Sequence, residues 1–309
     1  MKPQAAPLVV RSALREAFAQ LRAGEVPSHT LAGELLLLHV LGRDRAWMYT
    51  HPEEEISAPE AECFFKLVSR RAAGEPTQHL TGKQEFWGLE FEVTPDVLIP
   101  RPETEHVIEV ALDRLALRER CAGRPRKTDG AGLQIADIGT GSGCIAIALA
   151  KELPGAAFVA TDISSAALAV AQRNATRHGV AGRVRFIECN LLENVFDSPI
   201  AISRSPLLFD LVVSNPPYIG RREAATLMRE VREHEPEIAL YGGEEGYELY
   251  ADLIAEVATH LMPGGILVLE LGHNSLPAVQ PLLDASTWSK VSVTNDLAGI
   301  PRVLAAERL

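Results

Sequence analysis

The stretch that decides the fold is 133–162, LQIADIGTGSGCIAIALAKELPGAAFVATD. An apolar run at 133–139 is typical of a buried strand, and a second run at 158–162 ends in Asp162. Between them lie closely spaced glycines and an apolar helical pattern at 145–153. The order strand, glycine-rich turn, helix, strand is typical of an α/β protein with a parallel sheet.

The same alternation continues to the C-terminus. Helices are predicted at 166–178, 248–261 and 276–283. Strands are predicted at 184–189, 209–214, 266–271, 291–295 and 303–306. Together with the first two strands this makes a seven-stranded, doubly wound α/β sheet of Rossmann-like type, a strand number that suits a methyltransferase.

The residues before this predicted sheet show mainly the helical spacing of apolar residues. Helical spacing of apolar residues at 8–22, 31–41 and 59–74 predicts a small helical bundle, with Ser28 or Thr30 as the cap of its second helix. The alternating pattern of 84–100 predicts a bridging β-hairpin. We therefore expect an N-terminal helical domain at 1–82, a hairpin linker at 83–102 and the α/β domain at 103–309. A helical bundle of this kind suits a packing or partner-docking module.

The segment after the hairpin begins a helix. Pro102 suits a first helical turn, and the acidic residues that follow it are favourable near the positive end of the helix dipole. The polar span 118–132 is rich in Gly, Arg and Lys, and we expect a mobile loop there. Spacing alone assigns no role to Arg101.

Composition limits the possible functions. The chain has 309 residues with 47% hydrophobic and 23% charged residues, as in ordinary globular proteins. Its net charge of −11 disfavours broad nucleic-acid binding. The four cysteines show no metal-ligand spacing and suit reduced thiols, and no apolar run suits a signal peptide or a membrane span. We expect a cytoplasmic protein without a metal site.

The glycine loop after the first strand indicates a cofactor site. A dinucleotide site requires G-x-G-x-x-G, whereas Gly139, Gly141 and Gly143 follow G-x-G-x-G and Cys144 stands at the third dinucleotide position. S-adenosylmethionine carries a positive sulfonium and no phosphate, so the acidic Asp137 nearby is tolerable. Asp162 can accept from both ribose hydroxyls, although this feature alone does not separate the two cofactors.

A second unusual turn follows the predicted strand 209–214, with the sequence Ser-Asn-Pro-Pro-Tyr at 214–218. Two prolines cannot continue a sheet ladder, so the chain leaves the sheet at Asn215. The side-chain oxygen of Asn215 and the carbonyl of Pro216 can accept the two N–H groups of a planar amide or amine. The ring of Tyr218 can lie against its flat face.

These motifs occur together in one known family. The segments IPRPETE, DIGTGSGCIAIALA, TDIS and SNPPYI, in this order, resemble the protein-(glutamine-N5) methyltransferases of peptide-chain release factors. The resemblance covers nearly the whole chain, including EFWGLEF, 235–250 and 296–303. It implies the class I S-adenosylmethionine-dependent fold, with S-adenosylhomocysteine as product and class 1 release factors as partners.

The resemblance also implies residue roles. Asp162 would hold the ribose, and Asn190 and Leu191 would lie beside the adenine. The methionine part of the cofactor would be cradled by Gly139, Thr140, Gly141, Ser142 and Gly143. The substrate glutamine would be bound by Asn215, Pro216, Pro217 and Tyr218, with Asn215 also near the cofactor. Asn190 departs from the family, which has an acidic residue at this position.

The predicted chemistry is orientation rather than acid–base catalysis. Asn215, Pro216 and Tyr218 would be the catalytic residues because they fix the amide and favour charge developing on its nitrogen. One alternative is an adenine-N6 methyltransferase on RNA or DNA, in which the same turn grips the amine of a flipped base. Another is a non-enzymatic binding module, which the intact motifs oppose.

Overall fold

Seven strands form the central sheet within the described residues, and apolar runs explain why the middle residues of β3, β4, β6, β7 and β9 are buried. The computed structural model describes residues 7–121, 129–193, 195 and 208–309. The strand order is β5-β4-β3-β6-β7-β9-β8, with β9 antiparallel to both of its neighbours and the pairs from β5 to β7 parallel. The strands are β3 (Gln134–Ile138), β4 (Ala157–Asp162), β5 (Val184–Glu188), β6 (Phe209–Ser214), β7 (Leu261–Glu270), β8 (Trp288–Asn295) and β9 (Pro301–Arg308).

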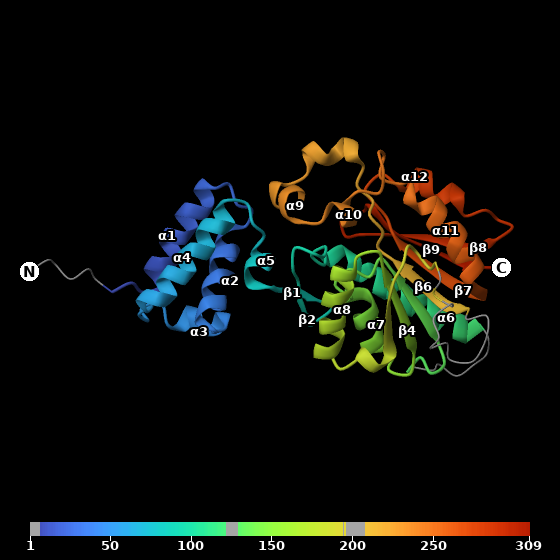
Figure 1. Cartoon of the computed structure of the whole chain (residues 1–309), viewed down its shortest axis with the longest axis horizontal. Coiled ribbons are helices and arrows are strands. Elements are labelled where there is room, and N and C mark those ends of the chain that lie inside the picture. Colours follow the sequence, from blue (N-terminus) through green and yellow to red (C-terminus); the bar gives the residue numbers. More distant parts are fainter. Residues whose placement is uncertain (1–6, 122–128, 194, 196–207) are drawn as a thin grey trace, which may run out of the picture. The chain divides into compact units, whose positions relative to one another are not determined.

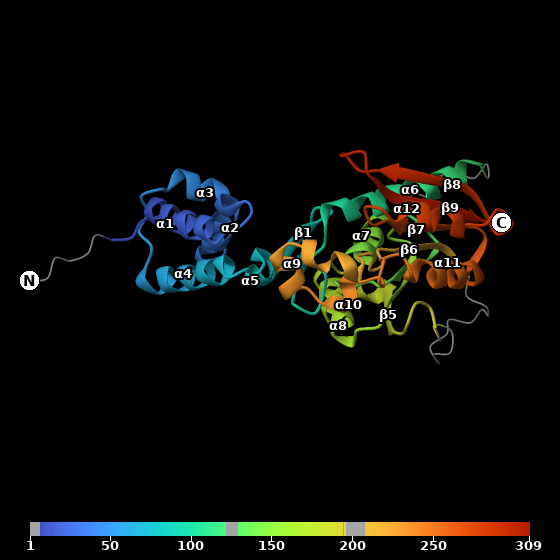
Figure 2. The same ribbon diagram turned by 90° about the horizontal axis from the view of Figure 1, so that it is seen from above.

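Helices cover both faces of this sheet, as Figures 1 and 2 show. On one face α6 (Glu105–Cys121) and α7 (Cys144–Glu152) pack against one set of alternating strand residues. On the other face α11 (Leu249–His260) and α12 (Leu276–Val279) pack against the complementary set. The predicted seven-stranded, doubly wound α/β sheet is therefore confirmed.

Several predicted helices differ in their bounds. The first turn at Pro102 is the 3-10 helix η1 (Pro102–Thr104), and the predicted helix 276–283 is split between α12 and a 3-10 turn. The other helices of the part of the chain that contains the sheet are α8 (Ser165–Arg177), η2 (Ala181–Arg183), η3 (Arg221–Thr226), α10 (Glu237–Leu240) and η4 (Gln280–Leu282).

The prediction of a loop from residue 118 is wrong at its start. Helix α6 continues to Cys121, and the Arg118 guanidinium donates to Asp210 Oδ1 at 2.6 Å. Asp210 Oδ2 in turn accepts from the backbone N–H of Gln134 at 2.9 Å. Helix α6 therefore continues beyond the apolar pattern that predicted it, and a long-range ion pair stabilises this last part of the helix. Residues 122–128 of the predicted loop lie outside the described residues.

The predicted hairpin is present as β1 (Lys83–Phe86) and β2 (Leu89–Glu92). Trp87 and Gly88 at its turn both have positive φ, 54° and 67°, as a two-residue type I′ turn requires. Asn174 of α8 accepts from the Glu92 N–H at 2.7 Å and donates to the Glu92 carbonyl at 3.0 Å. It also donates to the Ser142 carbonyl at 2.9 Å, so one buried amide joins the hairpin to the glycine loop.

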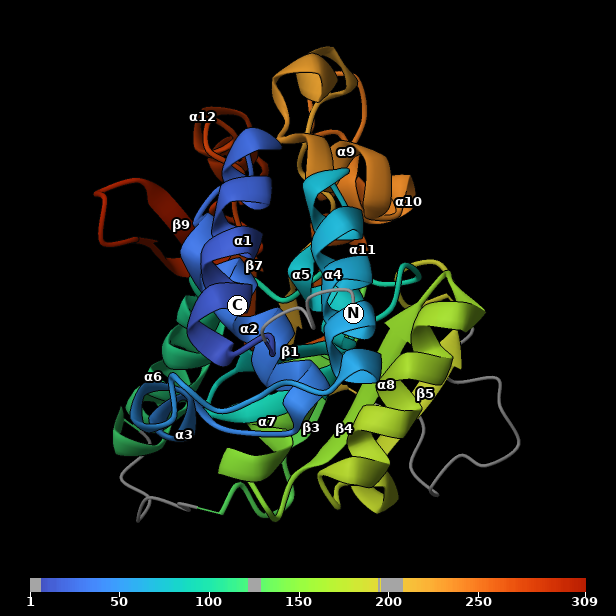
Figure 3. The same ribbon diagram turned by 90° about the vertical axis from the view of Figure 1, so that its left-hand side faces the viewer.

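The N-terminal unit has a core of its own. Its helices α1, α2 and α4 pack against one another (Figure 3). The side chains buried between them include Leu21, Leu36 and Phe64. Ser28 precedes α2 but makes no capping hydrogen bond, whereas Ser57 and Glu60 form a capping box at α4. The helices are α1 (Val10–Ala23), α2 (His29–Leu41), α3 (Arg45–Thr50), α4 (Ala58–Ala72), α5 (Thr77–Thr81) and α9 (Arg229–His234).

Helix α9 belongs to this unit although it lies far along the chain. The two compact units are Met1–Lys83 with Leu227–His234, and Gln84–Thr226 with Glu235–Leu309. The Arg71 side chain, only 6% exposed, donates to Glu230 of α9 and to the Glu75 carbonyl. The N-terminal unit is therefore assembled from two separate segments of the chain.

We expect Asn174→Ala to lower the free energy of unfolding by about 2–3 kcal/mol, because it leaves the partly buried backbone groups of Glu92 and the buried Ser142 carbonyl without their partner. Urea unfolding followed by circular dichroism measures this change. Gln172→Ala, at an exposed position of the same helix, is the matched control and should change stability by less than about 0.5 kcal/mol. Equal effects of the two substitutions would contradict the bridging role.

Candidate active site

A cavity of about 340 Å³ lies at the carboxyl ends of β3, β4, β5 and β6. Ligands of open α/β sheets bind at this edge. The cavity volume lies within the range of small-molecule sites. Predicted residues that line it are Gly139, Gly141, Asp162, Asn190, Leu191, Asn215, Pro216 and Pro217.

The glycine loop opens directly onto the cavity. Gly139 and Gly141 have φ of 69° and 55°, and a Cβ added at either would meet no atom within 4 Å. A side chain there would be strained and would occupy the space of a ligand. Gly143 also has a positive φ, but an added Cβ would come within 2.9 Å of Ile147 Cδ1. Two glycines thus leave room for a ligand, while the third allows close packing of α7.

Asp137 stabilises the glycine loop through two hydrogen bonds. Its Oδ2 accepts from the Thr140 hydroxyl at 2.7 Å and from the Ala146 N–H at 3.1 Å. The side chain is completely buried, and this burial raises the pKa of Asp137 to about 7 despite the two hydrogen bonds. Thr140 and Ser142 are themselves buried and do not line the cavity, and the Thr140 hydroxyl supports the loop through Asp137.

Asp162 ends β4 at the cavity wall. Its Oδ2 accepts from the Gly141 N–H and its Oδ1 from the Ser164 N–H, both at 2.9 Å. Burial raises the pKa of this carboxyl, whereas the two backbone donors oppose the shift. Each oxygen retains a second lone pair, so the carboxylate can still accept from a pair of ligand hydroxyls.

The turn after β5 lines a third side of the cavity. The exposed Asn190 donates through Nδ2 to Glu193 Oε1 at 3.4 Å. Leu191 has a φ of 47°, and its carbonyl accepts from the Thr161 hydroxyl at 2.7 Å. Because Asn190 donates through its nitrogen, its side-chain oxygen keeps its capacity to accept.

Asn215 leaves β6 beside the glycine loop. The preceding Ser214 hydroxyl donates to the Ile138 carbonyl at 2.8 Å, which joins the ends of β6 and β3. Asn215 Nδ2 donates to the Thr104 hydroxyl oxygen at 3.1 Å. Its Oδ1 is buried and has no hydrogen-bond partner among the described residues. An unpaired buried acceptor is unfavourable, so the carboxamide oxygen is available to a ligand N–H.

Tyr218 anchors the end of the same turn. Its hydroxyl donates to Glu270 Oε1 at 3.3 Å, and burial raises its pKa above the ordinary value. Glu270 is completely buried at the end of β7, and burial raises its pKa to about 7. The hydroxyl of Tyr250 donates to the Glu270 carbonyl at 2.7 Å. Tyr218 does not line the cavity.

Arg101 has a structural partner. It forms an ion pair with Glu235, a residue only 6% exposed, whose Oε2 also accepts from the Ile99 N–H at 3.1 Å. This pair fixes the segment 96–101 to the start of 235–243. Both segments contribute to the cavity wall. The role of Arg101 was invisible in the sequence because its partner lies 134 residues away.

Other cavity residues were also missed by sequence reasoning. They share apolar or mixed character and lie on segments without a motif, so no pattern singled them out. They are Asp96, Val97, Leu98, Ile138, Thr161, Ile163, Ser164, Ala167, Cys189, Ser214, Arg221, Glu237, Ile238, Ala239, Tyr241, Leu249 and Leu253.

Within the described part of the chain, no helix is both long and apolar enough to cross a membrane. Over the same residues, no group of three or more His, Cys, Asp or Glu side chains could hold a metal ion.

The sheet order, the glycine loop and the acidic end of β4 define a class I methyltransferase that uses S-adenosylmethionine. Family models agree: residues 12–82 match the PrmC N-terminal domain, and residues 126–237 match the methyltransferase small domain. The hMettl16 catalytic domain, solved in complex with the MAT2A 3′UTR hairpin 1, shares this fold with a TM-score of 0.52 and 17% identity. The superposition covers 84% of this chain and 83% of that one.

Sequence relatives identify the family within this class. A release factor glutamine methyltransferase of Koribacter versatilis is 41% identical over 301 residues, which cover 97% of this chain and 99% of the relative. One of Moorella thermoacetica is 42% identical over 302 residues, with the same coverage of both chains. The chain belongs to the release factor glutamine methyltransferase family.

Proposed function

We propose that this enzyme transfers a methyl group from S-adenosylmethionine to the side-chain amide nitrogen, N5, of the glutamine in the Gly-Gly-Gln motif of peptide-chain release factors. The observation that carries the proposal is the Asn215 carboxamide. Its Nδ2 is held by Thr104, and its Oδ1 is left without a partner among the described residues beside the glycine loop. A primary amide supplies the N–H that this oxygen lacks. Names of the relatives point to the same substrate.

The cavity fits the cofactor. Open space at Gly139 and Gly141 suits the methionine part, and Asp162 suits the ribose hydroxyls. Asn190 and Leu191 suit the adenine edge. S-adenosylmethionine supplies an electrophilic methyl group on a sulfonium when it is bound. The product is S-adenosylhomocysteine.

The residues of the turn orient the substrate. An amide nitrogen is a poor nucleophile because its lone pair is delocalised into the carbonyl. Asn215 Oδ1 accepts one N–H and the Pro216 carbonyl accepts the other, which fixes the nitrogen and favours positive charge developing on it. Pro217 stiffens the turn, and Tyr218 fixes its end through the hydrogen bond to Glu270. The proton leaves once the nitrogen has been methylated and has become acidic.

The partner is a class 1 release factor in the cytoplasm, where translation ends. Nucleic acid is not the substrate, since the net charge of −11 disfavours phosphate binding. We assign residues 1–82 to docking of the partner, residues 83–102 to the linker and residues 103–309 to catalysis.

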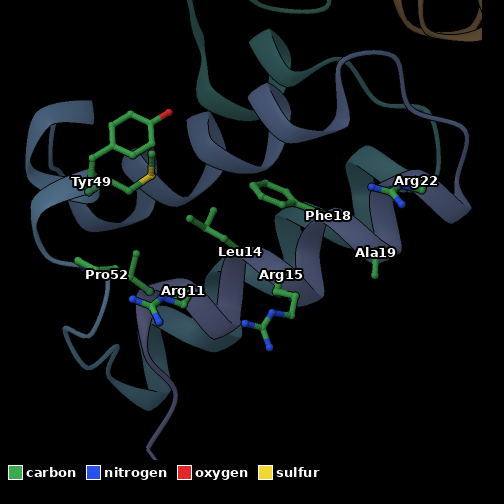
Figure 4. A pocket seen from close by; sticks show the side chains of 10 residues that line it. Arg11, Leu14, Arg15, Phe18, Ala19, Arg22, Tyr49 and Pro52 are labelled. Atoms are coloured by element: carbon green, nitrogen blue, oxygen red, sulfur yellow. The ribbon is translucent and has the colours of Figure 1, made fainter.

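A groove of about 540 Å³ in the N-terminal unit supports the docking role (Figure 4). Leu14 and Phe18 of α1 and Tyr49 of α3 give it an apolar lining. The exposed Arg15 and Arg22 lie at the same groove. This combination suits an acidic segment of the release factor with apolar residues beside it.

The cofactor assignment is tested at Asp162. Asp162→Ala should lower S-adenosylmethionine affinity about ten- to a hundredfold, because a charge-assisted hydrogen bond contributes roughly 1.5–3 kcal/mol. Isothermal titration calorimetry measures this affinity. Asp284→Ala, at an exposed carboxylate remote from the cavity-lining residues, serves as the control. Unchanged affinity in the Asp162 variant would refute the ribose assignment.

The substrate assignment is tested at Asn215. Asn215→Ala should lower kcat about 10²–10³-fold, because the amide loses the acceptor that orients it, while cofactor affinity changes little. Asn215→Asp should fail as well, since it brings a charge into the pocket.

Radiolabelled methyl transfer decides between substrates. Wild-type enzyme receives a release factor carrying Gly-Gly-Gln and, separately, the same factor with that glutamine changed to alanine. We expect label only in the first. Equal labelling of both proteins, or labelling only of added RNA or DNA, would end the glutamine proposal.

The docking assignment is tested by charge reversal. Arg15→Glu should lower kcat/KM for the whole release factor at least about tenfold, or about 1.4 kcal/mol, through repulsion of the acidic partner. Cofactor affinity and thermal unfolding should not change. Lys66→Glu makes the same charge change on exposed α4 outside the groove and should have no effect. Equal losses in both variants would contradict a docking groove.

A further inference from the structure

A second glycine-rich loop lies against the Asn-Pro-Pro-Tyr turn. It is the segment 242–248, Gly-Gly-Glu-Glu-Gly-Tyr-Glu, between α10 and α11. The Gly242 N–H donates to the Ile219 carbonyl at 3.0 Å, and the Arg221 N–H donates to the Gly243 carbonyl at 3.0 Å. The loop and the end of the turn are therefore joined along their backbones, although no step of the proposed reaction involves this loop.

Two glycines of the loop permit a close approach to the turn, and both are buried. A Cβ added at Gly242 would collide with the Pro217 carbonyl oxygen and would come within 2.6 Å of the Gly246 oxygen. A Cβ added at Gly246 would collide with the Tyr218 carbonyl oxygen. Gly246 has a φ of 94°, which in itself favours glycine, whereas the φ of Gly242 lies outside the left-handed region. Steric contact alone therefore excludes a side chain at Gly242.

Glu248 fixes the shape of the loop. Its Oε1 accepts from the Glu245 N–H at 2.8 Å. Its Oε2 accepts from the Gly246 N–H at 2.9 Å and from the Tyr247 N–H at 3.0 Å. One carboxylate thus holds three successive backbone groups, and these charge-assisted hydrogen bonds keep Gly246 in its place against the turn.

The turn needs support from outside, because Pro216 and Pro217 have no N–H to donate. We propose that the segment 242–248 is a clamp in which Gly242 and Gly246 are positioning residues. By holding the Pro217 and Tyr218 carbonyls, the clamp keeps the Pro216 carbonyl directed toward the substrate amide. This inference rests on the proposed function of the turn, and it extends that function to glycines that do not line the cavity.

Gly242→Ala tests the clamp by steric contact. The added methyl group should displace the Pro217 peptide, so we expect kcat for the Gly-Gly-Gln release factor to fall at least about tenfold. Affinity for S-adenosylmethionine, measured by calorimetry, should stay within about twofold. Gly182→Ala is the control, because its φ is also outside the left-handed region and an added Cβ would meet no atom within 4 Å. Wild-type kcat in Gly242→Ala would overturn the proposal.

Gly155→Ala separates positioning from stability. An added Cβ there would come within 2.9 Å of the Ala131 Cα, but Gly155 does not line the cavity. We expect this variant to unfold at a lower temperature and to keep its kcat below that temperature. Equal losses of kcat in Gly155→Ala and Gly242→Ala would show a merely structural role and would overturn the proposal.

A second pair of variants adds no bulk. Glu248→Ala removes the three hydrogen bonds that shape the loop, whereas Glu248→Gln keeps a side-chain oxygen that can accept. We expect Glu248→Ala to lower kcat about three- to tenfold, and more than Glu248→Gln does. Wild-type kcat in Glu248→Ala would contradict the clamp.

A double-mutant cycle shows whether the clamp acts through the turn. Asn215→Ala already frees the substrate amide to rotate, so the further change Gly242→Ala should lower kcat by less than about threefold. Losses that multiply in full would overturn the proposal. A wild-type enzyme that labels only nucleic acid would refute the glutamine substrate. The same cycle with that substrate would then decide the role of the clamp, because the turn would hold an exocyclic amine in the same way.

Discussion

The hydrogen bond from the Ser214 hydroxyl to the Ile138 carbonyl joins the two strand ends on which the site depends. Strand β3 releases the glycine loop one residue after Ile138, and β6 releases the Asn-Pro-Pro-Tyr turn one residue after Ser214. The two residues are also paired in the parallel ladder. The glycine loop and the Asn-Pro-Pro-Tyr turn therefore start from a shared, rigid point, and in the proposed reaction the sheet would fix the distance over which a methyl group must move.

Much of the fold could be predicted because its signals are local. Buried parallel strands read as continuous apolar runs, which placed β3, β4, β5 and β6 nearly to the residue. The glycine loop and Asp162 were predicted for the same reason, because the residues that indicate each feature are neighbours in the sequence. Helix α6 was less predictable at its end, because the ion pair between Arg118 and Asp210 joins residues 92 positions apart.

The support of Asn215 could not be predicted. Thr104 lies 111 residues before it in a segment that helix-start chemistry explains fully. Only the packing of η1 against the turn after β6 shows that Thr104 is buried against the carboxamide. Sequence reasoning thus found Asn215, the residue proposed to hold the substrate, and missed Thr104, which hydrogen-bonds to it.

The discontinuous N-terminal unit limits how this protein can be rebuilt by recombination. Arg71 is buried against Glu230, and the two residues are encoded 159 positions apart. An exchange of the first helices alone would leave a guanidinium buried without its carboxylate, which is strongly destabilising. New helices can therefore be inherited only with a compatible segment 227–234. A single crossover between the two segments would separate Arg71 from its partner Glu230 and break the folded unit. The two segments must therefore evolve together.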